Sequence, residues 1–130
     1  PQAKAAMQAL QDQFSPRQRE IDSAEKSLRQ EMEKLKNDAA IMSEEERRTA
    51  ERSIRDKQRD LARRQSEFVE DLNMRRNEEL GRLQSVVLKE VQEFAESGNF
   101  DLIVSDGVLF ASSSVDVTSQ VLEKLKSAGN

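Results

Sequence analysis

The residues that could carry out chemistry in this chain are carboxylates, lysines and arginines, because the sequence contains no cysteine and no histidine. Nucleophilic catalysis by cysteine, proton transfer by histidine and metal sites built on either side chain are therefore excluded. The sequence has no glycine-rich phosphate-binding loop. No pair of carboxylates stands out from the many acidic residues. We therefore predict a protein that is not an enzyme and that uses no cofactor or metal ion.

The remaining chemical feature is a basic segment. Residues 47–64 contain eight Lys or Arg and three Asp or Glu, although the whole chain has a net charge of −4. Such a segment attracts anionic partners, and a second basic group follows at Arg75 and Arg76. The candidate anion-binding residues are Arg47, Arg48, Arg52, Arg55, Arg63, Arg64, Arg75 and Arg76. Lipopolysaccharide, an anionic membrane surface and an acidic polypeptide are candidate partners.

Two alternatives compete with anion binding. The basic segment can be a solvated helix face on which oppositely charged residues four positions apart neutralise each other. Glu51–Arg55 and Asp60–Arg64 have this spacing. Nucleic acid is a further anionic partner, and it predicts steeply salt-dependent binding. We disfavour it because aromatic residues for base stacking make up only 4% of the chain and the net charge is negative.

The basic segment must lie on a long helix. Apolar residues recur every seven positions in the first part of the chain, at Met7, Phe14, Ile21, Leu28, Leu35 and Met42. A sustained heptad predicts a coiled-coil seam, meaning the apolar stripe along which two helices pack. Companion positions such as Arg17, Glu31 and Asp38 are polar. The predicted seam is therefore thin, with roughly one good apolar residue per heptad.

A second helix is predicted to begin near Glu44, after the first ends near Met42. Ser43 and Glu46 have the spacing of a capping box, in which each side chain bonds the other residue's backbone N–H. If the chain reverses here, positions whose numbers add up to about 86 face each other. Phe68 then falls between Phe14 and Ile21. We predict an antiparallel helical hairpin.

Several apolar residues lie along this hairpin and toward its tip. They either complete the seam or offer adaptable contacts to unfolded apolar partners, a use that suits flexible methionine. The candidate partner-binding residues are Met32, Leu35, Ile41, Met42, Ile54 and Leu61. Gly81 has two interpretations as well, either a tolerated helical glycine or a pivot or close-packing point.

The end of the chain changes character. Gly98-Asn99 predicts a helix C-cap. Two strands are predicted next, at Phe100–Val104 and Val108–Ala111, around an Asp-Gly turn. Thr118 is predicted to cap a last helix over 118–127. Two strands alone are marginal and leave unpaired edges. We therefore expect them to assemble with other copies. The candidate oligomerisation residues are Leu102, Val104, Val108, Phe110, Val115 and Val117.

The predicted fold is mostly α with a small β part. A long coiled-coil hairpin covers residues 7–99, with its tip near 37–45. A small β-rich assembly body covers residues 100–130 together with 1–6. No apolar run approaches the ~18 residues of a membrane span.

Three segments resemble one known family: Ser15–Asp22 (SPRQREID), Lys57–Gln84 (KQRDLARRQSEFVEDLNMRRNEELGRLQ) and Phe100–Leu122 (FDLIVSDGVLFASSSVDVTSQVL). The last is the most specific, and the match spans essentially the whole chain. The sequence resembles the Skp (OmpH-like) family of periplasmic chaperones. The resemblance implies a homotrimer in which a β-rich body carries three helical tentacles around a cavity. That cavity would hold unfolded outer-membrane proteins without ATP.

The chain departs from this family in one respect. Family members begin with an apolar strand of the type K-I-A-[VI]-V-[DN], and no such stretch precedes Pro1. We expect the lack of this strand to weaken the trimer. The chain also shows no signal peptide, which we interpret as removed from a periplasmic protein. The alternative to a chaperone is a structural coiled-coil scaffold that sets a distance and does not bind unfolded chains.

Overall fold

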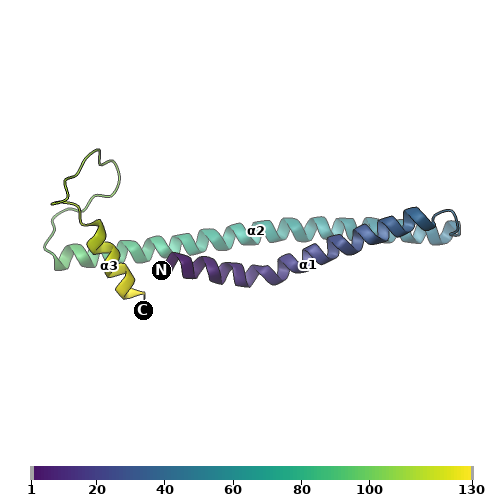
Figure 1. The fold of residues 1–130 in the computed structure, drawn as a ribbon, viewed down its shortest axis with the longest axis horizontal. Coiled ribbons are helices and arrows are strands. Elements are labelled where there is room, and N and C mark those ends of the chain that lie inside the picture. The colour runs from purple at the N-terminus through teal and green to yellow at the C-terminus, as the bar shows by residue number, and fades with distance from the viewer. Residues whose placement is uncertain (1, 130) are drawn as a thin grey trace. The chain divides into compact units, whose positions relative to one another are not determined.

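The structure is a computed structural model that describes residues 2–129. It contains three helices, α1 (Gln2–Asp38), α2 (Glu44–Ser97) and α3 (Thr118–Ala128) (Figure 1). Within residues 2–129 no segment forms a β-strand. The mostly helical fold predicted from sequence is thus confirmed, whereas the small β part is not shown among the described residues. The residues group into two compact units, Ala9–Arg76 and the combination of Pro1–Gln8 with Asn77–Asn130.

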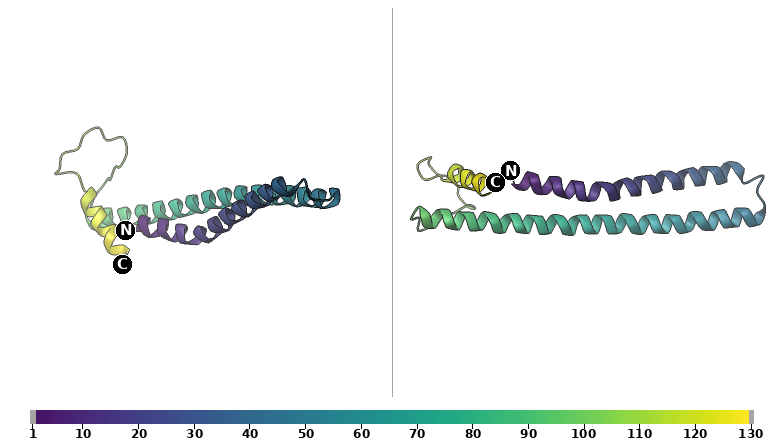
Figure 2. Two further views of the ribbon diagram at one scale, coloured as in Figure 1. Left: turned by 45° about the vertical axis from the view of Figure 1, so that its right-hand side comes forward. Right: turned by 90° about the horizontal axis from the view of Figure 1, so that it is seen from below.

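The unit Ala9–Arg76 is an antiparallel helical hairpin. Figures 1 and 2 show α1 and α2 side by side and running in opposite directions, joined by a short turn. Glu31 pairs with Lys57, and Arg17 pairs with Asp71. Glu25 accepts a hydrogen bond from Gln65. The residue numbers of these pairs add up to 88–90, which is within about one helical turn of the predicted register of about 86. The contacts show that polar positions of the heptad form interhelical bonds.

The apolar seam of the hairpin is thin. Among the described residues only Leu10, Phe14, Ile21 and Leu28 of α1 and Ile54 of α2 are buried. The buried α1 residues confirm the middle of the predicted heptad, but Met7 is exposed. Phe68 is half-buried, and its ring contacts that of Phe14 edge-on with 5.7 Å between centroids. At about 25 cal/mol per Å² of buried apolar surface, so few residues give the hairpin limited stability.

α1 contains Pro16, and the helix bends in its first half (Figure 1). Proline lacks the backbone N–H that would bond the preceding turn, and its ring crowds that turn's carbonyl. Ser15 also donates a hydrogen bond from Oγ to the carbonyl of Gln11 at 2.7 Å, a contact that favours bending. The bend has a local cause in the sequence.

α2 ends in a Schellman motif. The N–H of Phe100 bonds the carbonyl of Ala95 at 2.9 Å, and the N–H of Asn99 bonds that of Glu96 at 3.3 Å. Asn99 takes the left-handed conformation, with φ of 53°. The predicted C-cap is therefore present, with asparagine rather than glycine in the strained position. The Phe100 ring stacks on Phe94 with 5.5 Å between centroids, which completes the motif.

Residues 99–117, predicted to contain two strands, form turns, bends and irregular backbone without strand pairing (Figure 2). The physical reason is that an isolated pair of short strands has too little buried surface to be stable.

A second correction concerns the N-terminus of α3. Thr118 is its first helical residue, not its cap. The Asp116 carboxylate accepts bonds from the Thr118 hydroxyl and backbone N–H, which lower the pKa of Asp116.

Two contacts join the elements of this second unit. Lys124 of α3 lies 3.6 Å from the Glu93 carboxylate of α2, and Gln2 donates a hydrogen bond to the carbonyl of Leu125. A Cβ added at Gly81 would meet no atom within 4 Å. Gly81 is thus not a close-packing point, and the structure favours its interpretation as a tolerated helical glycine.

Candidate functional site

The turn of the hairpin is fixed by the predicted capping box. The N–H of Glu46 donates to Ser43 Oγ at 3.2 Å, and the N–H of Ser43 donates to the Glu46 carboxylate at 2.8 Å. The bond from the Ser43 amide, followed by that from its hydroxyl, lowers the pKa of Glu46. α1 ends earlier than predicted, at Asp38 rather than near Met42, because the Asp38 carbonyl accepts the N–H groups of Ile41 and Met42 and closes the turn.

The six candidate partner-binding residues differ in exposure. Ile41 is 86% exposed at the turn and Met32 is 45% exposed on α1. Leu35, Met42 and Leu61 are half-buried. Ile54 is buried at 8% exposure and belongs to the seam. The structure thus leaves five of the six at least partly accessible.

A groove near the turn brings three of these residues together with two of the candidate arginines. Its volume is about 400 Å³. We call it the distal groove, and its lining consists of Met32, Leu35, Lys36, Ala39, Arg47, Glu51, Ile54 and Arg55. Sequence analysis missed Lys36, Ala39 and Glu51. The predicted register contained the signal, because it places Ala39 opposite Arg47 and Lys36 opposite Glu51.

The basic residues divide into paired and unpaired groups. Arg48 pairs with Glu44 at 2.7 Å, and Arg64 pairs with Asp60 at 2.7 Å. Arg63 bonds both Asp60 and Glu67, which raises the pKa of Arg63, while the bond from Arg63 lowers the pKa of Asp60. These pairs support the neutralised helix face for this part of α2.

Three of the four candidate arginines nearest the turn are different. Within residues 2–129, Arg47, Arg52 and Arg55 make no ion pair, and the same holds for Arg76. The expected Glu51–Arg55 pair is not formed, although Asp60–Arg64 is. Exposed pairs of this kind contribute only about 0.3–0.5 kcal/mol, so spacing alone does not enforce them. Arg47 and Arg55, which line the distal groove, are therefore among the arginines that no ion pair neutralises within residues 2–129.

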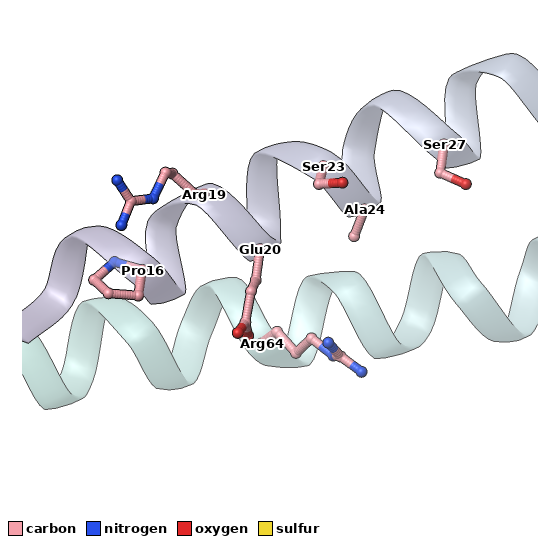
Figure 3. A pocket seen from close by; sticks show the side chains of 7 residues that line it. All are labelled: Pro16, Arg19, Glu20, Ser23, Ala24, Ser27 and Arg64. Atoms are coloured by element: carbon pink, nitrogen blue, oxygen red, sulfur yellow. The ribbon is translucent and has the colours of Figure 1, made fainter.

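A second hollow lies along α1 near Pro16 and has a volume of about 570 Å³ (Figure 3). Glu20 points from α1 toward Arg64 of α2, whereas Arg19 points away from α2. Ser23, Ala24 and Ser27 complete the α1 side. The apolar lining of this hollow comes from Pro16 and Ala24, which are smaller than the Met, Leu and Ile side chains of the distal groove, so it offers less to an apolar partner.

The candidate oligomerisation residues are accessible in the single chain. Val117 is half-buried, and the others are exposed, with Phe110 at 86%. Leu109, which the sequence analysis did not select, is fully exposed. Apolar side chains in this number are available for contact with another chain.

Across residues 2–129, no group of three or more acidic side chains is arranged to hold a metal ion. None of the helices described is long and apolar enough to cross a membrane.

The hairpin with its thin, partly ionic seam defines a coiled-coil protein with an arm. Residues 1–125 match the model of the family described as "Outer membrane protein (OmpH-like)". The chain belongs to this OmpH-like family. A relative from Yersinia enterocolitica named chaperone protein Skp is 25% identical over 127 residues, covering 97% of this chain and 77% of the relative. The Skp of Escherichia coli K12 is 29% identical over 119 residues, covering 90% and 72%. The family resemblance seen in the sequence is thus confirmed.

Proposed function

We propose that this protein is an ATP-independent holdase chaperone that binds unfolded outer-membrane proteins and prevents their aggregation. Two of its relatives carry the name chaperone protein Skp, and the chain belongs to the OmpH-like family. A chaperone of this kind is not an enzyme. Its clients, the unfolded outer-membrane proteins, would be met between the inner and outer membranes, so we assign the protein to the periplasm.

The observation that carries this proposal is the accessibility of apolar side chains on the hairpin arm. Met32 and Ile41 are exposed, and Leu35, Met42 and Leu61 are partly so. Scattered apolar contacts set among charges bind an unfolded chain weakly at many points. Such binding prevents association between clients without burying any of them so deeply that release requires ATP. Folding of the client elsewhere would drive release.

We further propose that the protein acts as a homotrimer. The exposed apolar residues of segment 100–117 include Leu102 and Phe110, and the segment has the composition of strands without the partners that strands need. Pairing with strands of neighbouring copies would give it those partners and form the small β-rich body. Three arms around such a body would enclose a cavity for one client.

Anionic partners are a further part of this proposal. The unpaired arginines near the turn, Arg47, Arg52 and Arg55, can attract acidic clients. The same charges suit lipopolysaccharide or an anionic membrane surface. These attractions weaken with ionic strength because the Debye length is only about 8 Å at physiological salt.

The test is suppression of aggregation. An outer-membrane β-barrel protein is diluted from urea into buffer with or without this protein, and light scattering is recorded. We expect scattering to be abolished at one trimer per client, without ATP. Unchanged aggregation in the presence of intact, trimeric protein would refute the proposal. A scaffold would instead bind one fixed partner saturably and show no preference for unfolded chains.

A further inference from the structure

The distal groove combines an apolar floor with a charged rim. Met32 and Leu35 of α1 and Ile54 of α2 supply apolar surface from the two sides. Lys36, Arg47 and Arg55 supply three cations around it. A volume of about 400 Å³ lies within the range of ~300–1,000 Å³ that is usual for specific binding pockets. The groove lies wholly inside the unit Ala9–Arg76.

The charges of the rim are unbalanced. Glu51 is the one carboxylate among the lining residues, against three cations. Neither Glu51 nor the cations form an ion pair with any residue of the described chain. The rim therefore carries a net positive charge, and none of its three cations is held in an ion pair within residues 2–129. An occupant with negative charge beside an apolar group would complement both features.

The floor can adapt to different occupants. Met32 is 45% exposed, and its Sδ accepts a hydrogen bond from Gln58 Nε2 at 3.8 Å. The thioether side chain is flexible and polarizable, so it can follow apolar side chains of different shape. Ile54, by contrast, is buried and gives the floor a fixed side.

We propose that the distal groove binds a short segment of polypeptide in which an aliphatic or aromatic side chain is flanked by carboxylates. The apolar side chain lies against Met32, Leu35 and Ile54, and the carboxylates pair with Arg47, Arg55 and Lys36. This inference rests on the proposed function and names the class of client segment that the arm selects. It joins two sets of residues that the sequence analysis treated as separate sites.

A membrane surface fits the same region less well. Immediately beyond the groove, the first turn of α2 carries Glu44, Glu45 and Glu46. An anionic bilayer is wide, so it would meet these carboxylates at the same time as the cations of the rim. A peptide segment is narrow enough to contact the groove alone. The local charge distribution therefore favours a peptide.

The direct test uses a short fluorescent peptide of alternating leucine and glutamate, with binding to the full chain measured by anisotropy. A peptide of alternating serine and glutamate keeps the negative charge but lacks apolar side chains, so it tests whether the apolar floor of the groove contributes to binding. The groove variant is Arg47→Glu with Arg55→Glu. The matched control is Arg29→Glu with Arg59→Glu, which changes the net charge equally on the same hairpin but outside the groove lining and outside the candidate anion-binding residues. Circular dichroism verifies that both variants fold.

We expect the groove variant to bind the leucine–glutamate peptide about tenfold more weakly, because two cations that attract its carboxylates become repulsive charges. The control variant should bind nearly as well as the original. The serine–glutamate peptide should bind weakly to all three proteins. Equal weakening by both variants, or equal binding of both peptides, would overturn the proposal. Loss of binding to phosphatidylglycerol vesicles by the groove variant alone, with peptide binding unchanged, would assign the groove to lipid instead.

The aggregation assay separates this inference from the proposed function. If the protein suppresses aggregation but the groove variant binds the leucine–glutamate peptide normally, the groove inference fails while the chaperone function stands. If the original protein binds the peptide in the groove but does not suppress aggregation, the proposed function fails and the peptide site remains.

Discussion

The ring of Phe14 in α1 packs edge-on against the ring of Phe68 in α2, at 5.7 Å between centroids and 74° between planes. Arg17 covers the same Phe68 ring, with its guanidinium carbon 5.9 Å from the centroid, and pairs with Asp71. This cluster forms an aromatic contact between the two helices of the hairpin. It adds aromatic packing to the apolar seam that Leu10, Phe14 and Ile21 of α1 form.

Replacing Phe68 with Ala should therefore destabilise the hairpin. Loss of a fully buried Phe costs about 3–5 kcal/mol, and Phe68 is half-buried, so we expect about 2 kcal/mol. Phe68→Leu, which keeps most of the apolar contact, should cost less than half as much. Urea unfolding followed by circular dichroism measures both. Equal stability of Phe68→Ala and the original protein would contradict the role of this contact.

Two glycines in or next to α2 should respond to alanine in opposite ways. A Cβ at Gly98 would lie 2.6 Å from the Phe100 ring and 3.2 Å from the Phe94 carbonyl, so Gly98→Ala should displace Phe100 from Phe94. Gly81 has open space around it, so Gly81→Ala should stabilise the helix by about 1 kcal/mol. Thermal unfolding measures whether each variant is more or less stable than the original protein. The nuclear Overhauser contact between the two Phe rings should persist in Gly81→Ala and disappear in Gly98→Ala.

The capping box at the hairpin turn should depend on pH. Hydrogen bonds from Ser43 lower the pKa of Glu46 in the folded protein below its ordinary value of 4.5. The stabilisation that the ionised Glu46 gives to the folded hairpin is therefore complete above the pKa that Glu46 has in the unfolded chain. It is lost as the pH falls through the folded pKa. The Ser43 amide resonance should titrate with a midpoint below 4.5, and Glu46→Gln should remove this titration. A midpoint at or above 4.5 would contradict the hydrogen bonds described here.

Mutations should affect the packing of the hairpin arm and the assembly of the oligomer independently. Leu61→Ala should loosen the half-buried packing of the arm and leave the oligomer intact. Val104→Asp or Val108→Asp should break the oligomer, because a charge would be placed on the surface that the proposed trimer would bury. Analytical ultracentrifugation measures the mass of each variant. Dissociation by Leu61→Ala, with an intact oligomer in Val104→Asp, would reverse the assignment of the two surfaces.

The hairpin could be predicted because its signals are local and repetitive. The spacing of Phe14, Ile21 and Leu28 defines one helix face, and Ser43 with Glu46 defines the turn. Register followed from the position of that turn. The polar bonds across the seam, such as Arg17–Asp71, were not predicted, since many acidic and basic residues compete for each other on charged helices. The strands predicted within 100–111 are absent from the described residues, because two short strands alone bury too little surface to be stable.

The distal groove was also missed as a unit. Its residues come from both helices, and its character depends on which charges remain unpaired. Arg55 had a partner at the right spacing, yet the structure leaves that pair unformed. Spacing along one helix predicts possible ion pairs, but small differences in free energy decide among them.

The central claim is that the protein recognises unfolded outer-membrane proteins. Sedimentation velocity with a fluorescent β-barrel client tests it most directly, using the client freshly diluted from urea and the same client already folded into lipid vesicles. We predict a complex of one trimer with one unfolded client and no complex with the folded client. Failure to form a complex with the unfolded client, or equal binding to both forms, would contradict the account.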